Sequence, residues 1–299
     1  MSRISIRFND LQLNGHFAVV EKAITNLKLK IEDGKVCQNL AILEIPIKVR
    51  NDMSHKLKNK VALVTGASKG IGAAIAKALA AEGASVIVNY ASSQENANKV
   101  VSEIQAEGGN AFAIQADMAH VPEIIRLFDE SIAHFGKLDI LVNNAGIMFS
   151  KPVSDTTEAD FDRIFAINVK GVFFACQQAA TRLSDGGRII SLSSSTTARL
   201  IPTYGAYVAT KGAVEQLTRS LSKEVGARGI TVNAISPGPI ETELFMTGKT
   251  PEQIDFFAKQ SAFSRLGQPQ EIADIVVFLA SDAARWISGQ NIRANGALA

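Results

Sequence analysis

Six short runs of the chain consist almost entirely of apolar residues, many of them β-branched, and polar segments separate each run from the next. A seventh, weaker run at 290–293 follows near the C-terminus. Short runs without an apolar/polar alternation are typical of strands that are buried on both faces of a sheet. We therefore predict strands at 61–65, 85–89, 111–115, 139–143, 188–192 and 230–235.

Longer segments with helical patterning lie between these runs. Glycines such as Gly136 and Gly229 stand where the predicted helices should end. Strands and helices that alternate at this spacing predict a parallel sheet with right-handed crossovers and helices on both faces. The expected fold class is α/β, a single Rossmann-type doubly wound parallel sheet. Its helices are predicted at 71–81, 95–106, 121–135, 158–182, 207–227 and 272–279.

The regular alternation stops after Pro237, and an irregular segment continues to about Leu266. This segment carries the apolar side chains of Leu244, Phe245 and Phe257. Ligands of open α/β sheets bind beyond the carboxyl ends of the strands, so an apolar segment at that place is suited to cover them. We expect a substrate lid after the sixth strand; the alternative is a helical excursion that only covers the core.

Residues 1–52 do not share the alternation. They mix charged residues with apolar fragments such as 41–49, which would suit a strand, and they contain no repeat and no motif. From Met53 the sequence looks like an ordinary N-terminus that leads directly into the first strand. We expect a domain at 53–299 and an extension at 1–52, which is either an accessory arm or translated sequence upstream of the true start.

The composition indicates a globular protein and excludes several classes of partner. With 46% hydrophobic residues, 20% charged residues and a net charge of +2, the chain offers no excess charge to nucleic acid or to an anionic membrane. Cys37 and Cys176 have no nearby Cys or His, so no metal site is expected. The chain also lacks a run of about 18 apolar residues and a secretory layout, so we expect the cytoplasm as its location.

A glycine-rich turn, T-G-A-S-K-G-I-G at 65–72, follows the first strand and opens into a helix. Glycines allow a tight turn and a close approach of the backbone to a pyrophosphate, whose charge a helix N-terminus stabilises. The spacing G-x-x-x-G-x-G differs from the strict G-x-G-x-x-G pattern, and its place between a strand and a helix indicates a dinucleotide site.

The end of the second strand indicates which dinucleotide binds. NAD sites usually present a carboxylate there to the ribose 2′-hydroxyl, whereas NADP requires donors or cations instead. The sequence N-Y-A-S-S at 89–93 has no carboxylate before Glu95. We predict that Asn89, Ser92 and Ser93 donate hydrogen bonds to a 2′-phosphate and that Lys69 pairs with it, which favours NADP(H).

Tyr207 and Lys211 stand at i and i+4 in A-Y-V-A-T-K-G, which places a phenol and an ammonium on one helical face. Reduction of a carbonyl by hydride leaves an alkoxide that must be protonated, and a free tyrosine, with a pKa near 10, is a slow donor at neutral pH. A nearby ammonium stabilises the phenolate, so we predict that Lys211 lowers the pKa of Tyr207. A serine hydroxyl would orient the substrate oxygen.

Taken in order, the glycine turn, N-N-A-G at 143–146, Ser194 after the fifth strand and Y-V-A-T-K at 207–211 resemble the short-chain dehydrogenase/reductase family, from about Lys56 to the C-terminus. The resemblance implies that Tyr207 is the catalytic acid/base and that Lys211 also binds the nicotinamide ribose. It implies that Ser194, thirteen positions before the tyrosine, is the catalytic serine. Asn168 matches the family's asparagine that holds a water in the proton relay.

The resemblance also extends the predicted cofactor site. Asp117 and Met118 match the pair that frames adenine, and the loop P-G-P-I-E-T at 237–242 matches the one over the nicotinamide carboxamide. The predicted cofactor residues are Gly66, Ser68, Lys69, Gly70, Ile71, Gly72, Asn89, Tyr90, Ser92, Ser93, Asp117, Met118, Asn144, Ala145, Gly146, Tyr207, Lys211, Pro237, Gly238, Ile240 and Thr242.

Three functions remain open. The sequence favours an NADP(H)-dependent aldehyde or ketone reductase, because its C-terminal segments 243–252, 278–282 and 286–296 resemble those of plant and bacterial carbonyl reductases and fungal naphthol reductases. A 3-oxoacyl-acyl-carrier-protein reductase is the second possibility. Arg228 matches one of its two basic docking positions, but Asp185 occupies the other and would repel an acidic carrier. The third is a non-enzymatic NADP-binding regulator on the same fold.

The family resemblance implies a homotetramer built through the helices 158–182 and 207–227. Both helices are unusually apolar, and V-F-F-A-C at 172–176 is more hydrophobic than a solvent-facing stripe should be.

Overall fold

The apolar runs of the sequence form seven parallel strands in the order β3-β2-β1-β4-β5-β6-β7. The computed structural model describes residues 55–299, so the predicted extension 1–52 lies outside the described residues. Every residue of the four central strands β1, β4, β5 and β6 is buried, as their continuous apolar pattern predicts. The strands are β1 (Val61–Val64), β2 (Ser85–Tyr90), β3 (Asn110–Gln115), β4 (Ile140–Asn143), β5 (Arg188–Leu192), β6 (Thr231–Pro237) and β7 (Asn291–Ala294).

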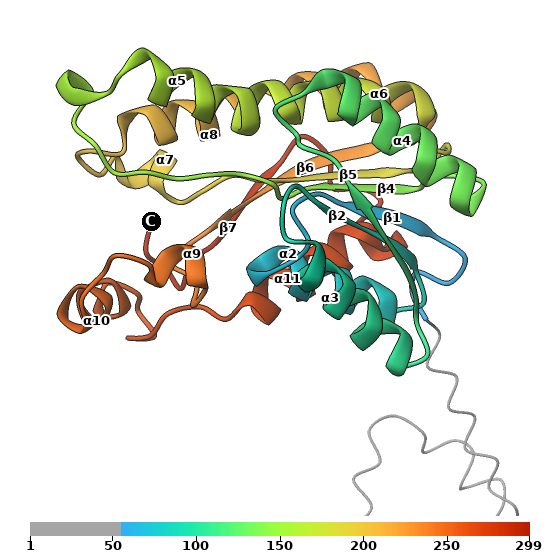
Figure 1. Cartoon of the computed structure of the whole chain (residues 1–299), viewed down its shortest axis with the longest axis horizontal. Helices are drawn as coiled ribbons and strands as arrows, with labels where there is room; N and C mark the ends of the chain where they lie inside the picture. Colours follow the sequence, from blue (N-terminus) through green and yellow to red (C-terminus); the bar gives the residue numbers. More distant parts are fainter. Residues whose placement is uncertain (1–54) are drawn as a thin grey trace, which may run out of the picture. The chain divides into compact units, whose positions relative to one another are not determined.

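Helices cover both faces of the sheet and form two separate apolar cores (Figure 1). Leu79 and Val276 lie in the core on one face, and Phe128 and Val214 lie in the core on the other. One layer consists of α2 (Gly70–Ala81), α3 (Gln94–Ala106) and α11 (Pro269–Ala280), and the other of α4 (Val121–Phe135), α5 (Glu158–Phe165), α6 (Val172–Arg182) and α8 (Gly205–Glu224). The predicted doubly wound α/β fold is confirmed.

The order of the strands reverses between β1 and β4. The chain winds outward from β1 to β3, returns to the middle of the sheet, and then winds in the other direction from β4 to β7. Such a reversal opens a crevice at the carboxyl ends of the central strands, where open α/β sheets bind their ligands. The glycine turn, Asn144 and Ser194 all follow strands at this edge.

Three predicted elements differ from the structure. The helix predicted at 158–182 is interrupted by a π-helical segment, Ala166–Gly171, that separates α5 from α6. The helix predicted at 207–227 begins at Gly205 and ends at Glu224. The segment after Pro237 is less irregular than predicted, because it contains α9 (Glu243–Met246) and α10 (Pro251–Lys259). A short helix, α7 (Thr196–Arg199), was not predicted at all.

The π-helical segment has identifiable contacts. Asn168 lies in it with no solvent exposure, and its amide bonds to the backbone of another segment. A Cβ on Gly171 would lie 2.5 Å from the carbonyl oxygen of Met118, so only glycine allows this approach. Single π turns inside α-helices occur frequently at functional sites. Tertiary contacts of this kind are not visible in a periodic pattern.

Within residues 55–299, no helix is long and apolar enough to cross a membrane.

Candidate active site

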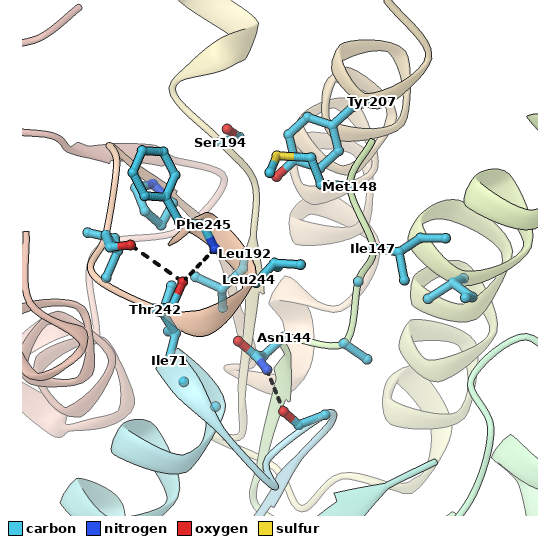
Figure 2. A pocket seen from close by; sticks show the side chains of 18 of the residues that line it. Ile71, Asn144, Ile147, Met148, Leu192, Ser194, Tyr207, Thr242, Leu244 and Phe245 are labelled. Carbon is cyan, nitrogen blue, oxygen red and sulfur yellow. Dashed lines mark hydrogen bonds between the residues drawn. The ribbon is translucent and has the colours of Figure 1, made fainter. Parts of the chain in front are cut away.

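A cavity of about 540 Å³ opens at the carboxyl ends of the central strands. All the predicted cofactor residues line it, together with Ser194. Figure 2 shows Ser194, Tyr207 and Met148 at one end of this cavity and Ile71 and Asn144 at the other. The fold therefore brings the predicted cofactor and catalytic residues to one place, with Asn168 packed behind the wall.

The glycine turn has the geometry that a bound pyrophosphate requires. Gly66 and Gly70 have φ values of 61° and 57°, a region that residues with a side chain rarely adopt. A Cβ on Gly72 would lie 2.4 Å from both the amide nitrogen of Asn144 and the carbonyl oxygen of Gly66. Helix α2 begins without a side-chain cap, so its first N–H groups are free to bind an anion. These residues fit a dinucleotide.

Thr65 and Asn144 hold the turn against β4. The Thr65 hydroxyl oxygen accepts hydrogen bonds of 3.0 Å from the backbone N–H groups of Asn144 and Ala145. The Asn144 amide donates to the carbonyl oxygens of Thr65 and Gly66. The cofactor cradle is thus fixed by contacts between its two strands.

The structure gives Asn89 a different role from the predicted phosphate ligand. Its side chain is buried, its oxygen accepts a 3.1 Å hydrogen bond from Gly66 N–H, and its amide nitrogen donates to the carbonyls of Ile114 and Ala116. Both sides of the amide are therefore engaged with the backbone. The prediction that Asn89 donates to a 2′-phosphate is wrong for this arrangement; the residue instead ties the glycine turn to β2 and β3.

Lys69 lies at the mouth of the cavity with its ammonium 2.9 Å from a carboxylate oxygen of Glu243, on α9. Both side chains are more than half exposed, so this ion pair contributes little stability. Ser92 and Ser93 line the cavity at the end of β2, as the sequence predicts. Lys69 remains accessible to a phosphate, provided that the phosphate competes with Glu243.

Ser194, Tyr207 and Lys211 meet where β5 and α8 adjoin. The Ser194 hydroxyl oxygen accepts hydrogen bonds from the N–H and the hydroxyl of Thr196, at 3.2 and 2.9 Å. Tyr207 lies in the first turn of α8 and is partly exposed to the cavity. Lys211 is buried, its Nζ donates a 2.7 Å hydrogen bond to the Leu192 carbonyl, and it lies 5.7 Å from the centroid of the Tyr207 ring.

Burial dominates the protonation of both groups. It raises the pKa of Tyr207 to about 12, an effect that a hydrogen bond from Ser194 opposes and the neighbouring Tyr204 reinforces. Burial also lowers the pKa of Lys211 to about 8. The prediction that Lys211 lowers the pKa of Tyr207 is wrong for this arrangement, because the ammonium is directed to the Leu192 carbonyl. Tyr207 is held as a neutral phenol, the form that donates a proton.

Asn168 lies behind the predicted catalytic residues and connects them to the cavity wall. Its oxygen accepts a 2.9 Å hydrogen bond from Ile147 N–H, and its amide donates to the Ile147 carbonyl and to the Thr210 hydroxyl. Thr210 in turn donates to the backbone carbonyl of Tyr207 at 2.7 Å. The water-holding role of Asn168 remains a prediction; the contacts show that it joins the π-helical segment to the first turn of α8.

Several cavity residues did not follow from the sequence. Tyr204 packs edge-on against Tyr207, with ring centroids 6.3 Å apart. Its position three residues before Tyr207 is the one feature of the sequence that could have predicted this contact. Arg199 lines the cavity from α7 and donates to the side chain of Gln260. The apolar part of the wall includes Leu244, Phe245 and Phe257 of the predicted lid, and it also includes side chains that the sequence did not indicate, among them Ile147, Met148, Ile201 and Leu298.

Comparison with known proteins places this site in a family. Residues 66–298 match the family model described as enoyl-(acyl carrier protein) reductase. A probable tetrahydroxynaphthalene reductase from Zymoseptoria tritici is 45% identical over 256 residues, which cover 82% of this chain and 96% of the relative. A versicolorin reductase from Emericella nidulans is 45% identical over 255 residues, covering 81% of this chain and 97% of the relative.

Solved structures agree with these sequence matches. A short-chain dehydrogenase from Burkholderia cenocepacia, in complex with NADP, superposes with a TM-score of 0.77 at 39% identity and covers 81% of this chain and 98% of its own. The chain therefore belongs to the short-chain dehydrogenase/reductase family. Its relatives are oxidoreductases, and the family assignment supports a nicotinamide cofactor.

Proposed function

We propose that the protein is an NADP(H)-dependent reductase that converts a ketone or aldehyde into an alcohol. The observation that carries this proposal is the joint position of the Ser194 hydroxyl and the Tyr207 phenol at one end of the dinucleotide cavity. A carbonyl oxygen bound between two hydroxyl donors is polarised toward attack, and the charge that develops on it is stabilised. A site with this pair is built for carbonyl chemistry.

Each residue has a distinct task in the proposed reaction. NADPH, when bound, supplies the hydride. Ser194 orients the carbonyl oxygen, and Tyr207 transfers its phenolic proton to the alkoxide that forms there. Lys211 is buried one helical turn beyond Tyr207 and lines the same cavity, where its ammonium would bind the nicotinamide ribose. The raised pKa of Tyr207 supports the reduction direction, because the residue enters the reaction protonated.

The choice of NADP over NAD rests on the end of β2. Ser92 and Ser93 line the cavity there without a carboxylate, and Lys69 supplies a cation from the glycine turn. The Burkholderia cenocepacia structure contains NADP, which supports the same choice.

The proposed substrate is an apolar ketone, and an aromatic one fits best. The lid segment contributes Leu244, Phe245 and Phe257 to the cavity wall, and Met148 faces them from the β4 side. Aromatic side chains of this kind favour packing against a planar ring. Two relatives carry the names of polycyclic aromatic substrates, tetrahydroxynaphthalene and versicolorin.

The carrier-protein alternative is disfavoured by Arg228. Its Nε lies 2.7 Å from an Asp185 carboxylate oxygen, and its guanidinium also donates to the backbone carbonyls of Ala180 and Leu183. An arginine engaged in this way within its own chain is poorly placed to recruit an acidic carrier. If the protein were a non-enzymatic NADP-binding regulator, the Ser194 and Tyr207 hydroxyl groups would have no catalytic role.

A panel of carbonyl compounds tests the proposal. NADPH oxidation would be followed with a bicyclic aromatic ketone, an aliphatic ketone, an aldehyde and a 3-oxoacyl thioester, and each would be repeated with NADH. We expect turnover of the aromatic ketone with NADPH. Tyr207→Phe should lower kcat by about 10²–10⁴-fold, the usual range for a general acid, while NADPH still binds. Tight NADPH binding by the wild type without turnover of any compound would favour the regulator.

We also propose a homotetramer that buries apolar faces of α5 and α6. Phe161 and Phe173 are 44% and 48% exposed in the single chain, although solvent-facing helical stripes are usually polar. Light scattering should give about four times the mass of one chain, and a monomeric peak would contradict this assembly.

A further inference from the structure

Glu215 is a carboxylate of α8 that gathers hydroxyl groups from three other segments. Its Oε1 atom accepts hydrogen bonds of 2.7 Å from both Ser193 and Thr197, and one of 3.4 Å from Ser236. Ser193 directly follows β5, Thr197 belongs to α7 and Ser236 belongs to β6. One oxygen atom thus joins α8 to the carboxyl edge of the sheet.

The partners of Glu215 bracket the catalytic serine. Ser193 and Thr197 lie one residue before and three residues after Ser194, and the Thr197 hydroxyl oxygen also lies 2.8 Å from the Ser194 carbonyl oxygen. The Ser194 hydroxyl accepts hydrogen bonds from Thr196, the first residue of α7, and its hydrogen bond to Tyr207 opposes the rise in the pKa of that phenol. From α8, Glu215 thus binds two side chains of the segment 193–197 that contains Ser194.

The carboxylate also occupies a defined place on the catalytic helix. Glu215 lies one turn beyond Lys211 and two turns beyond Tyr207 on α8. Ser193, one of its two partners at 2.7 Å, also approaches the backbone carbonyl of Lys211, at 3.4 Å. Within residues 55–299, Glu215 forms no salt bridge, and the side chains that contact its carboxylate are hydroxyl groups. Hydrogen bonds to an ionised acceptor are stronger than those between neutral groups.

We propose that Glu215 is a positioning residue that fixes the Ser194 hydroxyl relative to Tyr207 and Lys211. The inference rests on the proposed function, because it assigns Glu215 an effect on carbonyl reduction that is transmitted through Ser194. Displacement of the serine by even a fraction of an ångström would weaken the donor pair on the substrate oxygen, and small misplacements lower rates steeply.

Substitutions at Glu215 separate positioning from general stability. Glu215→Leu removes the acceptor and should lower kcat at least tenfold, with KM for the ketone changed less than threefold and the Kd for NADPH unchanged. Glu215→Gln retains an acceptor oxygen at the same place and should restore most of the loss. Glu224→Leu removes an exposed glutamate of the same helix and serves as the control; it should leave kcat unchanged.

A double-mutant comparison with Ser194→Ala tests the route of the effect. If Glu215 acts through Ser194, Glu215→Leu should change kcat less than twofold in the Ser194→Ala background. An unchanged kcat for Glu215→Leu in an otherwise wild-type chain, or a full tenfold loss that persists without Ser194, would overturn the inference. Wild-type turnover that Tyr207→Phe abolishes would establish the proposed function separately; its absence would contradict that function and this inference together.

Discussion

The ammonium of Lys211 lies 5.7 Å from the centre of the Tyr207 ring, one helical turn away on α8, but it donates its hydrogen bond to the Leu192 carbonyl. Burial therefore acts on the two groups in opposite senses, since it raises the pKa of the phenol and lowers that of the ammonium. Both shifts favour the neutral forms. Helix α8 thus places the neutral Tyr207 phenol next to the Lys211 ammonium, whose charged form is destabilised by burial.

The cost of the buried ammonium should appear in the pH dependence of stability. The pKa of Lys211 is lowered from 10.5 to about 8, so between these values the unfolded chain holds a proton that the folded chain has lost. The free energy of unfolding should therefore rise with pH across this window. Below pH 8 the full penalty applies, and it amounts to about 3 kcal/mol.

Lys211→Met should remove this penalty. We expect the variant to be inactive but more stable than the wild type at pH 7, by about 2 kcal/mol once the lost hydrogen bond to Leu192 is subtracted. This difference in the free energy of unfolding should shrink as pH rises from 8 to 10. Ionisation of Tyr207 in the unfolded chain, which lowers stability as pH rises, becomes important only above this range. Urea unfolding at pH 7, 8, 9 and 10 measures it. A variant less stable than the wild type by the same amount at every pH would contradict this account.

Cofactor choice should depend on Lys69. Lys69→Ala removes the cation proposed to bind the 2′-phosphate, so the Kd for NADPH should rise about tenfold or more while the Kd for NADH stays the same. Glu243→Gln is the matched control, because it frees Lys69 from its ion pair and should leave NADPH binding equal or tighter. Fluorescence titration of both cofactors gives these constants. Equal losses for NADPH and NADH would show that Lys69 does not read the phosphate.

Asn168 should stabilise the fold as well as the site. Asn168→Ala would leave the half-buried N–H and carbonyl of Ile147 without their side-chain partners, and each unsatisfied group costs up to about 1–3 kcal/mol. We expect a lower midpoint of thermal unfolding together with a loss of activity. Thr210→Val removes only one of the contacts of Asn168 and should have a smaller effect on stability. An Asn168→Ala variant with wild-type stability would exclude this role.

The sequence predicts most of the fold because its strands are continuous apolar runs separated by glycine-ended helices. The position of β5, for example, follows from R-I-I-S-L alone, and α4 ends at Gly136 as predicted, with this glycine in the left-handed conformation. The π-helical segment does not follow from periodicity, because it depends on contacts of Asn168 and Gly171 with segments distant in sequence.

For the candidate site as well, some features follow from the sequence and others depend on the folded structure. The residues that gather at the cavity follow from motif spacing, because the carboxyl ends of parallel strands share one edge of the sheet. The roles of individual side chains depend on tertiary contacts, which the motif spacing does not show. Asn89 is a plausible phosphate donor by residue type, but its amide is engaged with three backbone groups. The ion pair between Lys69 and Glu243 joins residues 174 positions apart that no local pattern connects.

The central claim is hydride transfer to a carbonyl carbon with Tyr207 as the acid, and isotope transfer tests it most directly. The protein would be incubated with an apolar aromatic ketone and NADPH deuterated at C4 of the nicotinamide, using each C4 epimer in turn. Mass spectrometry of the alcohol would then locate the label. The account predicts one deuterium on the new carbinol carbon from one epimer only, and labelled alcohol that forms about 10²–10⁴-fold more slowly with Tyr207→Phe. Alcohol that forms without deuterium from either epimer would contradict it.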